Sequence, residues 1–241
     1  FTVKFKNQIL KIKKNKAKPV NFIKNVKDIK NLISLVHLHE PELLNIISAR
    51  YYQNLIYTFT GSILLAVNPF KNLDIYNTKF ILDYHNQNND DPHIYNLSNT
   101  AYKNLLQDKK NQSILISGES GAGKTVSAKY IMKYLSFLSS NIHKKKDAEI
   151  ENIIIASNPI LESFGNAKTI RNDNSSRFGK FIKLYFNSSG VLINGKIETY
   201  LLEKVRVINQ SKSERNFHIF YQLLNKKPFN NYVPKNITYY N

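Results

Sequence analysis

A chain of 241 residues, of which 42% are hydrophobic, is long enough to bury a core and can form one large domain or two small ones. It carries a formal charge of +18 and no cysteine, so disulfides and thiolate metal sites are excluded. The apolar runs are too short to cross a bilayer and no signal peptide is visible, so we expect no transmembrane segment and a cytoplasmic location.

The positive charge is spread over lysine-rich and asparagine-rich segments rather than gathered in one block. Two interpretations remain open. A basic face can attract an anionic polymer, such as a nucleic acid or an acidic filament. Alternatively, the lysines only fill solvated positions. The sequence contains no RNA-binding aromatic motif and no zinc pattern, and this favours the second interpretation. We therefore expect no nucleic-acid partner.

The first half of the chain is predicted to alternate short helices with strands. Leucines at helical spacing, followed by Pro41 at a helix entry, indicate two helices in this region. Strand formers on both sides of Gly61 indicate a hairpin, whose second strand at residues 63–67 is expected to be buried. In chain order, the expected elements are strands within residues 1–22, two short helices within 25–47, the hairpin at 51–67, a surface loop at 83–91 and a helix at 92–106.

The second half is predicted to contain longer helices and a long hairpin. Apolar residues recur at helical spacing after residue 124, and this pattern ends near Ser139. The turn residues 187–190 separate two strand-like runs, which indicates a β-hairpin. In chain order, the expected elements are a strand at 113–117, the helix from 124, an exposed connection at 139–147, a helix at 148–164 that Pro159 bends or ends, strands at 181–186 and 191–200, and a helix at 216–224.

An eight-residue segment between the strand at 113–117 and the following helix has the G-x-x-x-x-G-K-[ST] spacing of a phosphate-binding loop. Its glycines allow successive N–H groups to point inward, and the positive end of the new helix adds to this anion site. The lysine can reach the outer phosphates, and the threonine hydroxyl can bind Mg²⁺. A chance glycine-rich turn is disfavoured by the strand and the helix on its two sides. The segment comprises Gly118, Glu119, Ser120, Gly121, Ala122, Gly123, Lys124 and Thr125.

A second polar segment, at residues 172–180, suits a loop that closes over a γ-phosphate. Of its adjacent hydroxyls, Ser175 and Ser176, one can complete a Mg²⁺ shell opposite Thr125. The other hydroxyl, with an amide, can hold the phosphate or an attacking water. Alone, the segment could be a serine-rich surface turn, but the phosphate loop upstream in the same chain favours the functional interpretation.

A third candidate segment follows the strand at 63–67, where α/β sheets place their ligands. The Asn68 amide could read a base edge, and Pro69 and Tyr76 offer flat surfaces for stacking. Taken alone, Asn-Pro is more often a simple turn, so this base-binding interpretation depends on the other two segments.

Together, the loop at 118–125 and the segment at 172–180 resemble those of the myosin motor domain. The resemblance extends over roughly residues 32–224, and residues 126–130 are more similar to unconventional myosins than to muscle-type ones. It implies an α/β fold of the P-loop NTPase type, with a mixed central β-sheet flanked by helices. It also implies that residues 1–24 are the remnant of an N-terminal β unit and linker, and that residues 25–241 are the N-terminal part of the motor domain.

The resemblance implies ATP and Mg²⁺ as cofactors and assigns a role to each candidate residue. Three sets of roles follow: Lys124 on the β- and γ-phosphates with Thr125 and Ser176 as Mg²⁺ ligands; Asn172, Ser175 and Ser176 at the γ-phosphate and the lytic water; and Asn68, Pro69 and Tyr76 beside adenine. Arg177 matches the arginine that pairs with a glutamate of the family's second switch. No such switch is found in the sequence, so Arg177 is expected to lack its partner.

The resemblance implies the ATP-binding portion of a motor that couples Mg-ATP hydrolysis to movement on actin filaments in the full-length protein, where light chains are possible. The chain begins at Phe1 and stops before a second switch, so both ends are interpreted as cut, and we expect weak nucleotide binding without motor-rate hydrolysis. A kinesin-type motor shares a Ser-Ser-Arg but not Glu119 or residues 178–180. A second alternative is the nucleotide-binding module of a non-motile myosin-like protein.

Overall fold

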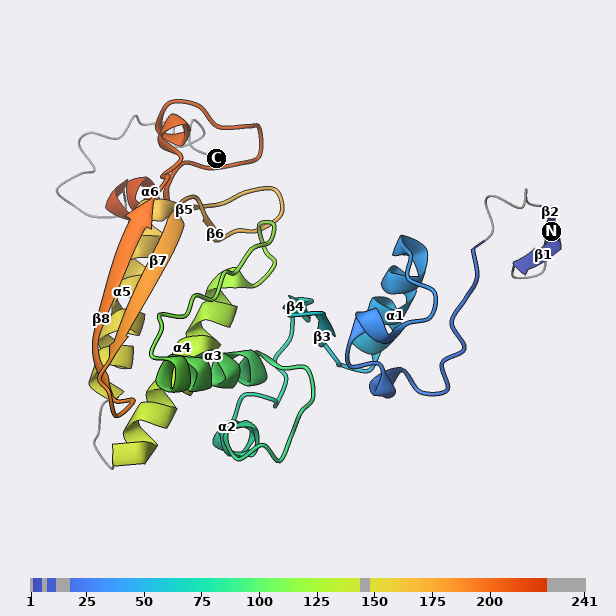
Figure 1. Ribbon diagram of the computed structural model, residues 1–241. Coiled ribbons are helices and arrows are strands. Elements are labelled where there is room, and N and C mark those ends of the chain that lie inside the picture. The colour runs from blue at the N-terminus through green and yellow to red at the C-terminus, as the bar shows by residue number, and fades with distance from the viewer. Residues whose placement is uncertain (1, 6–7, 12–17, 144–147, 225–241) are drawn as a thin grey trace. The chain divides into compact units, whose positions relative to one another are not determined.

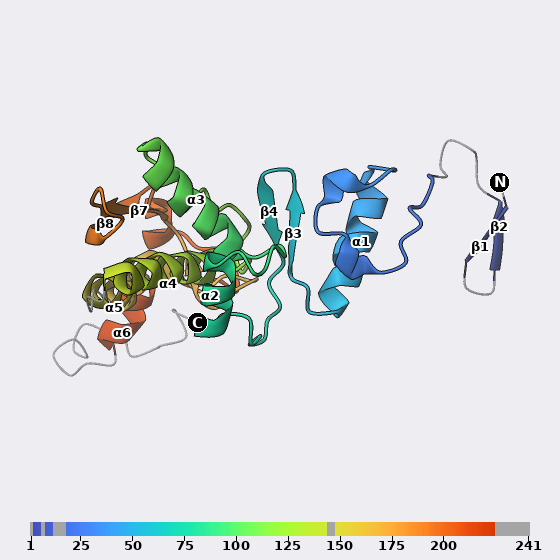
Figure 2. The same cartoon turned by 60° about the horizontal axis from the view of Figure 1, so that its bottom comes forward.

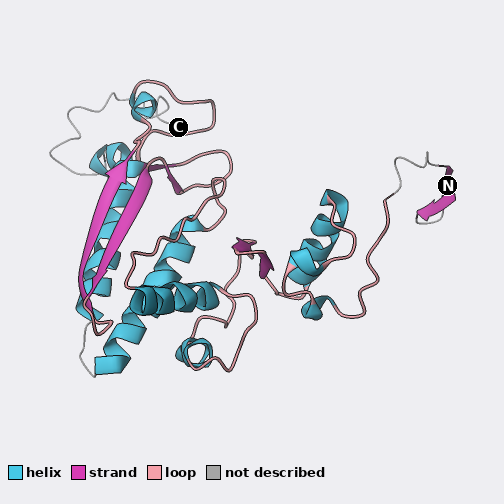
Figure 3. Cartoon of the chain, viewed as in Figure 1, coloured by secondary structure: helices cyan, strands magenta, loops and turns pink. Residues whose placement is uncertain are grey.

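The computed structural model describes residues 2–5, 8–11, 18–143 and 148–224. The backbone divides into two compact units. The first comprises Phe1–Leu73 with Asp91–His93, and the second comprises Asp74–Asp90 with Ile94–Asn241. Helices and strands occur in both units, so the protein is of the mixed α/β class (Figure 3).

The first unit contains two hairpins and one regular α-helix (Figure 1). The strands expected near the N-terminus are present and pair antiparallel. The first of the two expected helices consists only of 3-10 turns, whereas the second is longer than expected. Its N-cap is His39, whose side chain accepts from the backbone N–H of Glu42, and proline lies in its first turn as predicted. The elements are β1 (Thr2–Phe5), β2 (Gln8–Lys11), η2 (Val26–Asp28), η3 (Leu32–Ser34), α1 (Glu40–Tyr52), β3 (Tyr57–Thr60) and β4 (Ile63–Ala66).

The predicted hairpin around Gly61 is confirmed, but the predicted burial of its second strand is wrong. Gly61 has φ +64°, a conformation that glycine adopts without steric cost. Strand β4 pairs with β3, and Ile63 at its start is 62% exposed. Among the described residues no third strand pairs with this hairpin. The core of this unit lies instead around Leu32, Leu35 and Ile46.

The second unit carries the long helices and the long hairpin. Strands β7 and β8 run antiparallel beside α5 (Figure 1), and Figure 2 shows α4 and α5 side by side. Helix α2 was not predicted from the sequence, and because it extends to His85, the predicted surface loop at 83–91 begins later than expected. The elements are α2 (Thr78–His85), α3 (Ile94–Asp108), α4 (Lys124–His143), α5 (Ala148–Gly165), β5 (Asn166–Ala167), β6 (Ser175–Ser176), β7 (Gly179–Phe186), β8 (Leu192–Tyr200), η4 (Lys204–Val207) and α6 (His218–Leu224).

Helices α3 and α4 form the core of the second unit. The rings of Tyr95 and Tyr134 are both fully buried and stack with centroids 5.0 Å apart. Of the apolar positions predicted from helical spacing on α4, all but the half-buried Ala128 are buried, as expected for a face that packs against a neighbouring helix. The buried positions are Ile131, Met132, Leu135 and Leu138.

The mixed central sheet expected from the sequence is not seen among the described residues, which form four separate two-stranded sheets. The strand predicted at residues 113–117 is also absent, and Leu115 within it is 91% exposed. A strand exists only where a neighbour accepts and donates its ladder hydrogen bonds, and no described segment pairs with residues 113–117. The local apolar pattern was therefore not sufficient to make this segment a strand.

The prediction of an exposed connection at 139–147 is wrong for the first residues of this range. Helix α4 continues to His143, and Ser139 is fully buried. The Ser139 hydroxyl accepts a hydrogen bond of 2.7 Å from the backbone N–H of Leu192 at the start of β8. Residues 144–147 lie outside the described residues. In the described part of the chain, every helix is too short or too polar to cross a bilayer.

Candidate nucleotide-binding site

The glycine loop adopts a bend that requires its glycines. Gly121 and Gly123 have φ values of +81° and +93°, which place them in the left-handed region that only glycine enters without strain. At Gly118, an added Cβ would lie 3.0 Å from the Cβ of Ala122. The backbone N–H of Ala122 donates to the carbonyl of Glu119 over 3.2 Å and closes the turn. Helix α4 begins directly after the bend, at Lys124.

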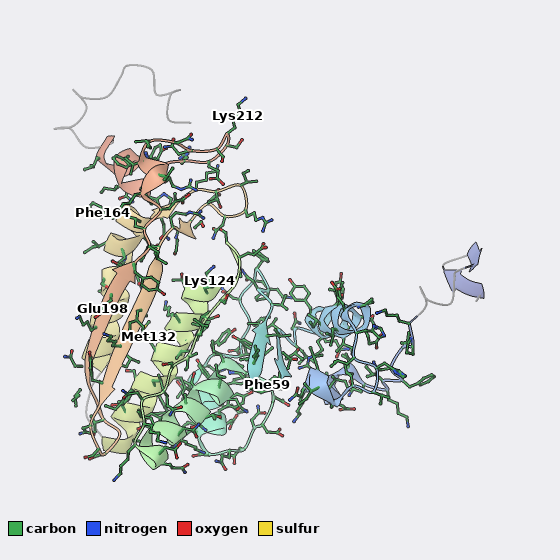
Figure 4. The ribbon with its side chains drawn as sticks, turned by 45° about the horizontal axis from the view of Figure 1, so that its top comes forward. Phe59, Lys124, Met132, Phe164, Glu198 and Lys212 are labelled. Atoms are coloured by element: carbon green, nitrogen blue, oxygen red, sulfur yellow. The ribbon has the colours of Figure 1, made fainter. Side chains whose placement is uncertain are left out.

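Lys124 bends back over its own loop (Figure 4 labels it at the start of α4). Its ammonium donates to the carbonyl oxygens of Gly118 and Glu119 over 2.7 and 2.8 Å. An ammonium carries three donors, so the third is available to an incoming anion while these two bonds hold the side chain over the loop. The first N–H groups of α4, which begins at Lys124, have no intrahelical acceptor, so they are further donors at this end of the loop.

The loop and the serine segment lie side by side. The Ser120 hydroxyl donates to the Ser175 hydroxyl over 2.8 Å. A Cβ added at Gly121 would lie 3.7 Å from the carbonyl oxygen of Arg171, so the two backbones are also in close contact. Glu119 and Arg171 form an ion pair across the same boundary. The tertiary structure therefore brings together the two segments that the sequence analysis singled out.

Strands β5 and β6 hold the serine segment in place. Ser175 pairs with Ala167 and Ser176 pairs with Asn166 in this short antiparallel ladder. Because side chains alternate along a strand, the two hydroxyls point to opposite faces. Ser175 is 3% exposed, whereas Ser176 is exposed to solvent, as is Thr125 on the first turn of α4.

Arg177 has a partner, contrary to expectation. Its Nε lies 2.5 Å from Oε2 of Glu203, and its Nη1 donates to the Ser175 hydroxyl over 3.2 Å. Desolvation raises the pKa of Glu203, but hydrogen bonds and charges from Arg177 and Arg206 lower it more, so the net pKa is below its ordinary value. The sequence analysis did not single out Glu203. The available signal was the predicted β-hairpin, whose strands begin after Arg177 and end before Glu203, but the register that sets Gly179 opposite Tyr200 comes from the structure.

The Asn172 side chain forms local hydrogen bonds within its own segment, although its Cβ lies beside the loop, 3.8 Å from a Cβ added at Gly121. Its Oδ1 accepts from the backbone N–H of Asn174 over 3.0 Å, and its backbone carbonyl accepts from the Thr169 hydroxyl over 3.1 Å. The amide is thus engaged in a local turn of the kind that asparagine side chains commonly form.

The three residues expected beside adenine belong to two different units, Asn68 and Pro69 to the first and Tyr76 to the second. Asn68 accepts from the backbone N–H of Phe70 over 3.0 Å, which is the simple turn considered in the sequence analysis. Pro69 lines a cavity of about 160 Å³ within the first unit. Tyr76 belongs to the second unit, where its ring stacks on Tyr130 of α4 with centroids 3.6 Å apart and an interplanar angle of 6°.

These donors fit a magnesium-bound triphosphate. The positive-φ glycines hold the loop open at a helix N-terminus, Lys124 supplies a cation at its mouth, and hydroxyls are present on both neighbouring segments. Mg²⁺ prefers oxygen ligands and keeps several waters, so the hydroxyls of Thr125 and Ser176 suit it together with phosphate oxygens. The backbone geometry and donor set of the loop therefore suit a phosphate ligand.

A comparison with protein family models identifies the family. The model of the myosin head (motor domain) matches residues 29–240 of this chain. The protein therefore belongs to the myosin head family, and the resemblance inferred from its sequence is confirmed. Membership implies, in general terms, an ATPase that binds Mg-ATP and actin. The kinesin-type alternative is excluded.

Proposed function

We propose that this chain is the ATP-binding portion of an actin-based myosin motor, which couples Mg-ATP hydrolysis to movement on actin filaments in the full-length protein. The observation that carries this proposal is the hydrogen bond from Ser120 to Ser175, which joins the phosphate loop to the serine segment beside Lys124. A glycine-rich turn without a ligand role would not require a hydrogen bond to a serine segment 55 positions away in the chain.

In this proposal, the loop residues 118–123 bind the phosphates through their backbone N–H groups, and Lys124 neutralises the β- and γ-phosphates. Thr125 and Ser176 hold Mg²⁺, which neutralises the charge that develops on the phosphates during transfer. Ser175 and Asn172 hold the γ-phosphate and orient water. Binding requires Asn172 to release Asn174, because the amide is engaged there in this structure.

The adenine end of the ligand is proposed to lie against Asn68, Pro69 and Tyr76. Of these, the best supported is Tyr76, because its stack on Tyr130 fixes it to the same helix that begins at the phosphate loop. We also propose the division of the chain into residues 1–24, a remnant of an N-terminal β unit with a linker, and residues 25–241, the N-terminal part of the motor domain. In the full-length protein, a cytoplasmic, cytoskeleton-associated location with light chains as possible partners follows from the proposed motor role.

A second candidate function is a non-motile, nucleotide-binding module of the myosin type. It is favoured by one observation: Arg177 is bound by Glu203, so the guanidinium that would close a motor site is already engaged. The two functions share the same nucleotide site and differ in whether hydrolysis follows binding.

The test is calorimetric titration of the 241-residue chain with Mg-ATP, comparing Lys124→Ala with Lys129→Ala, an exposed lysine on the same helix. Because hydrogen bonds to charged groups contribute most at such sites, we expect Lys124→Ala to lose roughly 100-fold in affinity and the control to change less than about twofold. Unchanged binding in Lys124→Ala, or no binding by the unaltered chain, would overturn the proposal.

A further inference from the structure

Glu203 lies between two arginines in the turn that follows β8. Its carboxylate accepts from Nε of Arg177 over 2.5 Å and from Nε of Arg206 over 2.8 Å. Its backbone N–H donates to the carbonyl of Arg177 over 2.9 Å, so main chain and side chain both bind the same residue. The carboxylate therefore has little freedom to move without breaking bonds on both sides.

Arg206 fixes Glu203 from the other side. The Arg206 side chain is 4% exposed, and it donates to Oε2 of Glu214 over 2.9 Å and to the carbonyl of Arg215 over 3.0 Å. Two arginines and two glutamates thus alternate, and each charge is paired. Such a network contributes little net stability, but removing one member leaves a charge without its partner. Each of the four side chains is therefore held in a defined position by its neighbours.

The consequence of this network appears at Ser175. Its hydroxyl accepts from Nη1 of Arg177 over 3.2 Å and from the Ser120 hydroxyl over 2.8 Å. A serine hydroxyl has two acceptor positions and one donor. Since both acceptor positions are occupied, the Ser175 proton is left to donate to an acceptor outside the network. A phosphate oxygen only accepts, so it complements this donor.

We propose that Glu203 is a positioning residue of the nucleotide site. By holding Arg177, it makes the Ser175 hydroxyl a fixed donor toward the terminal phosphate, and it thereby sets a preference for ATP over ADP. This inference rests on the proposed nucleotide-binding function. The pairing belongs to this chain's own hairpin and needs no glutamate from a second switch.

The experiment measures the affinities of the 241-residue chain for Mg-ATP and for Mg-ADP, with Glu203→Gln and the control Glu198→Gln. Glu198 is an ion-paired carboxylate on β8 that binds Lys183 and Lys196 and takes no part in the network (Figure 4). For Glu203→Gln, we expect the ratio of ATP to ADP affinity to fall about tenfold with the ADP affinity unchanged, since one charge-assisted hydrogen bond to the terminal phosphate is misdirected. The control should keep the ratio.

Two further variants separate positioning from simple folding. Glu203→Asp retains the charge, so it should restore part of the ratio. In a double-mutant cycle, adding Glu203→Gln to Arg177→Gln should cause no further loss, because the carboxylate acts through the guanidinium. A ratio is insensitive to the fraction of folded chain, whereas a purely structural role would weaken both nucleotides together.

Each outcome decides the matter. If Glu203→Gln raises the ATP affinity, Arg177 binds phosphate when freed, and the inference is overturned. An unchanged ratio in a chain that binds both nucleotides also overturns it and leaves the proposed function standing. If the unaltered chain binds neither nucleotide, the proposed function falls and the inference with it.

Discussion

The hydroxyl of Ser120 donates to the hydroxyl of Ser175 across 2.8 Å, although the two residues are 55 positions apart in the chain. One belongs to the glycine loop and the other to the two-residue strand β6. This bond and the ion pair of Glu119 and Arg171 beside it hold two polar segments together. Two polar segments that are fixed in this way can surround an anionic ligand from two sides.

The magnesium ligands can be tested by comparing nucleotide with and without metal. Ser176→Ala and Thr125→Ala should each weaken binding of Mg-ATP about tenfold more than binding of ATP in the presence of EDTA, because each removes one oxygen ligand. Ser127→Ala, on the same helix as Thr125, serves as the matched control and should affect neither form. Titration calorimetry measures both. If a variant loses the same affinity in the two conditions, its hydroxyl is not a ligand.

The depressed pKa of Glu203 predicts a pH-dependent contribution to stability. Although desolvation raises this pKa, the hydrogen bonds and charges of Arg177 and Arg206 hold it below the ordinary value of 4.5. The ionised carboxylate therefore stabilises the fold above the unfolded-state pKa, and this contribution is lost as the pH falls through the folded-state pKa. Glu203→Gln should have a lower unfolding midpoint near neutral pH, and its midpoint should fall less than that of the unaltered chain on acidification below about pH 4.5.

Thermal unfolding followed by circular dichroism at a series of pH values measures this difference. The two curves are expected to converge at acidic pH, where the carboxylate is protonated in both folded and unfolded states. Parallel curves would show that Glu203 gains nothing from its two arginines.

Arg50 is expected to be essential for the first unit. It is 3% exposed, and its guanidinium donates to Thr58 Oγ1 at 2.8 Å, to the Tyr57 carbonyl at 2.9 Å and to the Val26 carbonyl at 3.0 Å. Arg50→Met should cost about 3 kcal/mol, because buried acceptors lose their donor. Arg50→Lys should recover only part of this, since an ammonium lacks the planar fork.

Hydrogen exchange of the amides of α1 measures the effect within that unit. The control is Lys27→Met, an exposed lysine near the same helix, which should change stability by less than about 0.5 kcal/mol. Unchanged exchange rates in Arg50→Met would mean that the three acceptors find other donors.

Tyr102 links α3 to the turn between β7 and β8. Its hydroxyl donates to the carbonyl of Gly190 over 2.7 Å, and burial raises its pKa. Tyr102→Phe should destabilise the chain by about 1–2 kcal/mol, because a buried carbonyl is left without a donor. Tyr185→Phe, at a ring that is 44% exposed on β7, should be nearly neutral. Urea unfolding followed by circular dichroism compares the two variants, and equal effects would assign no role to the bond.

Much of the fold was predictable where the signal was local. The apolar spacing of α4, the turn between β7 and β8 and the glycine spacing of the loop each lie within a short window, and each has one favoured backbone solution. Predictions failed where burial had to be inferred. Ile63 was expected to be buried and Ser139 exposed, and both are the reverse. The burial of a residue depends on which other element packs over it, and a local pattern does not contain that information.

The sequence by itself determined the bend at Gly121 and Gly123 and the cation at Lys124, because backbone conformation and side-chain reach at these positions depend on residue type and short spacing. Only the tertiary structure decided that Arg177 binds Glu203 and that Ser120 meets Ser175. The first pair is separated by 26 positions and the second by 55, so each contact exists only once intervening elements have folded back and fixed their register.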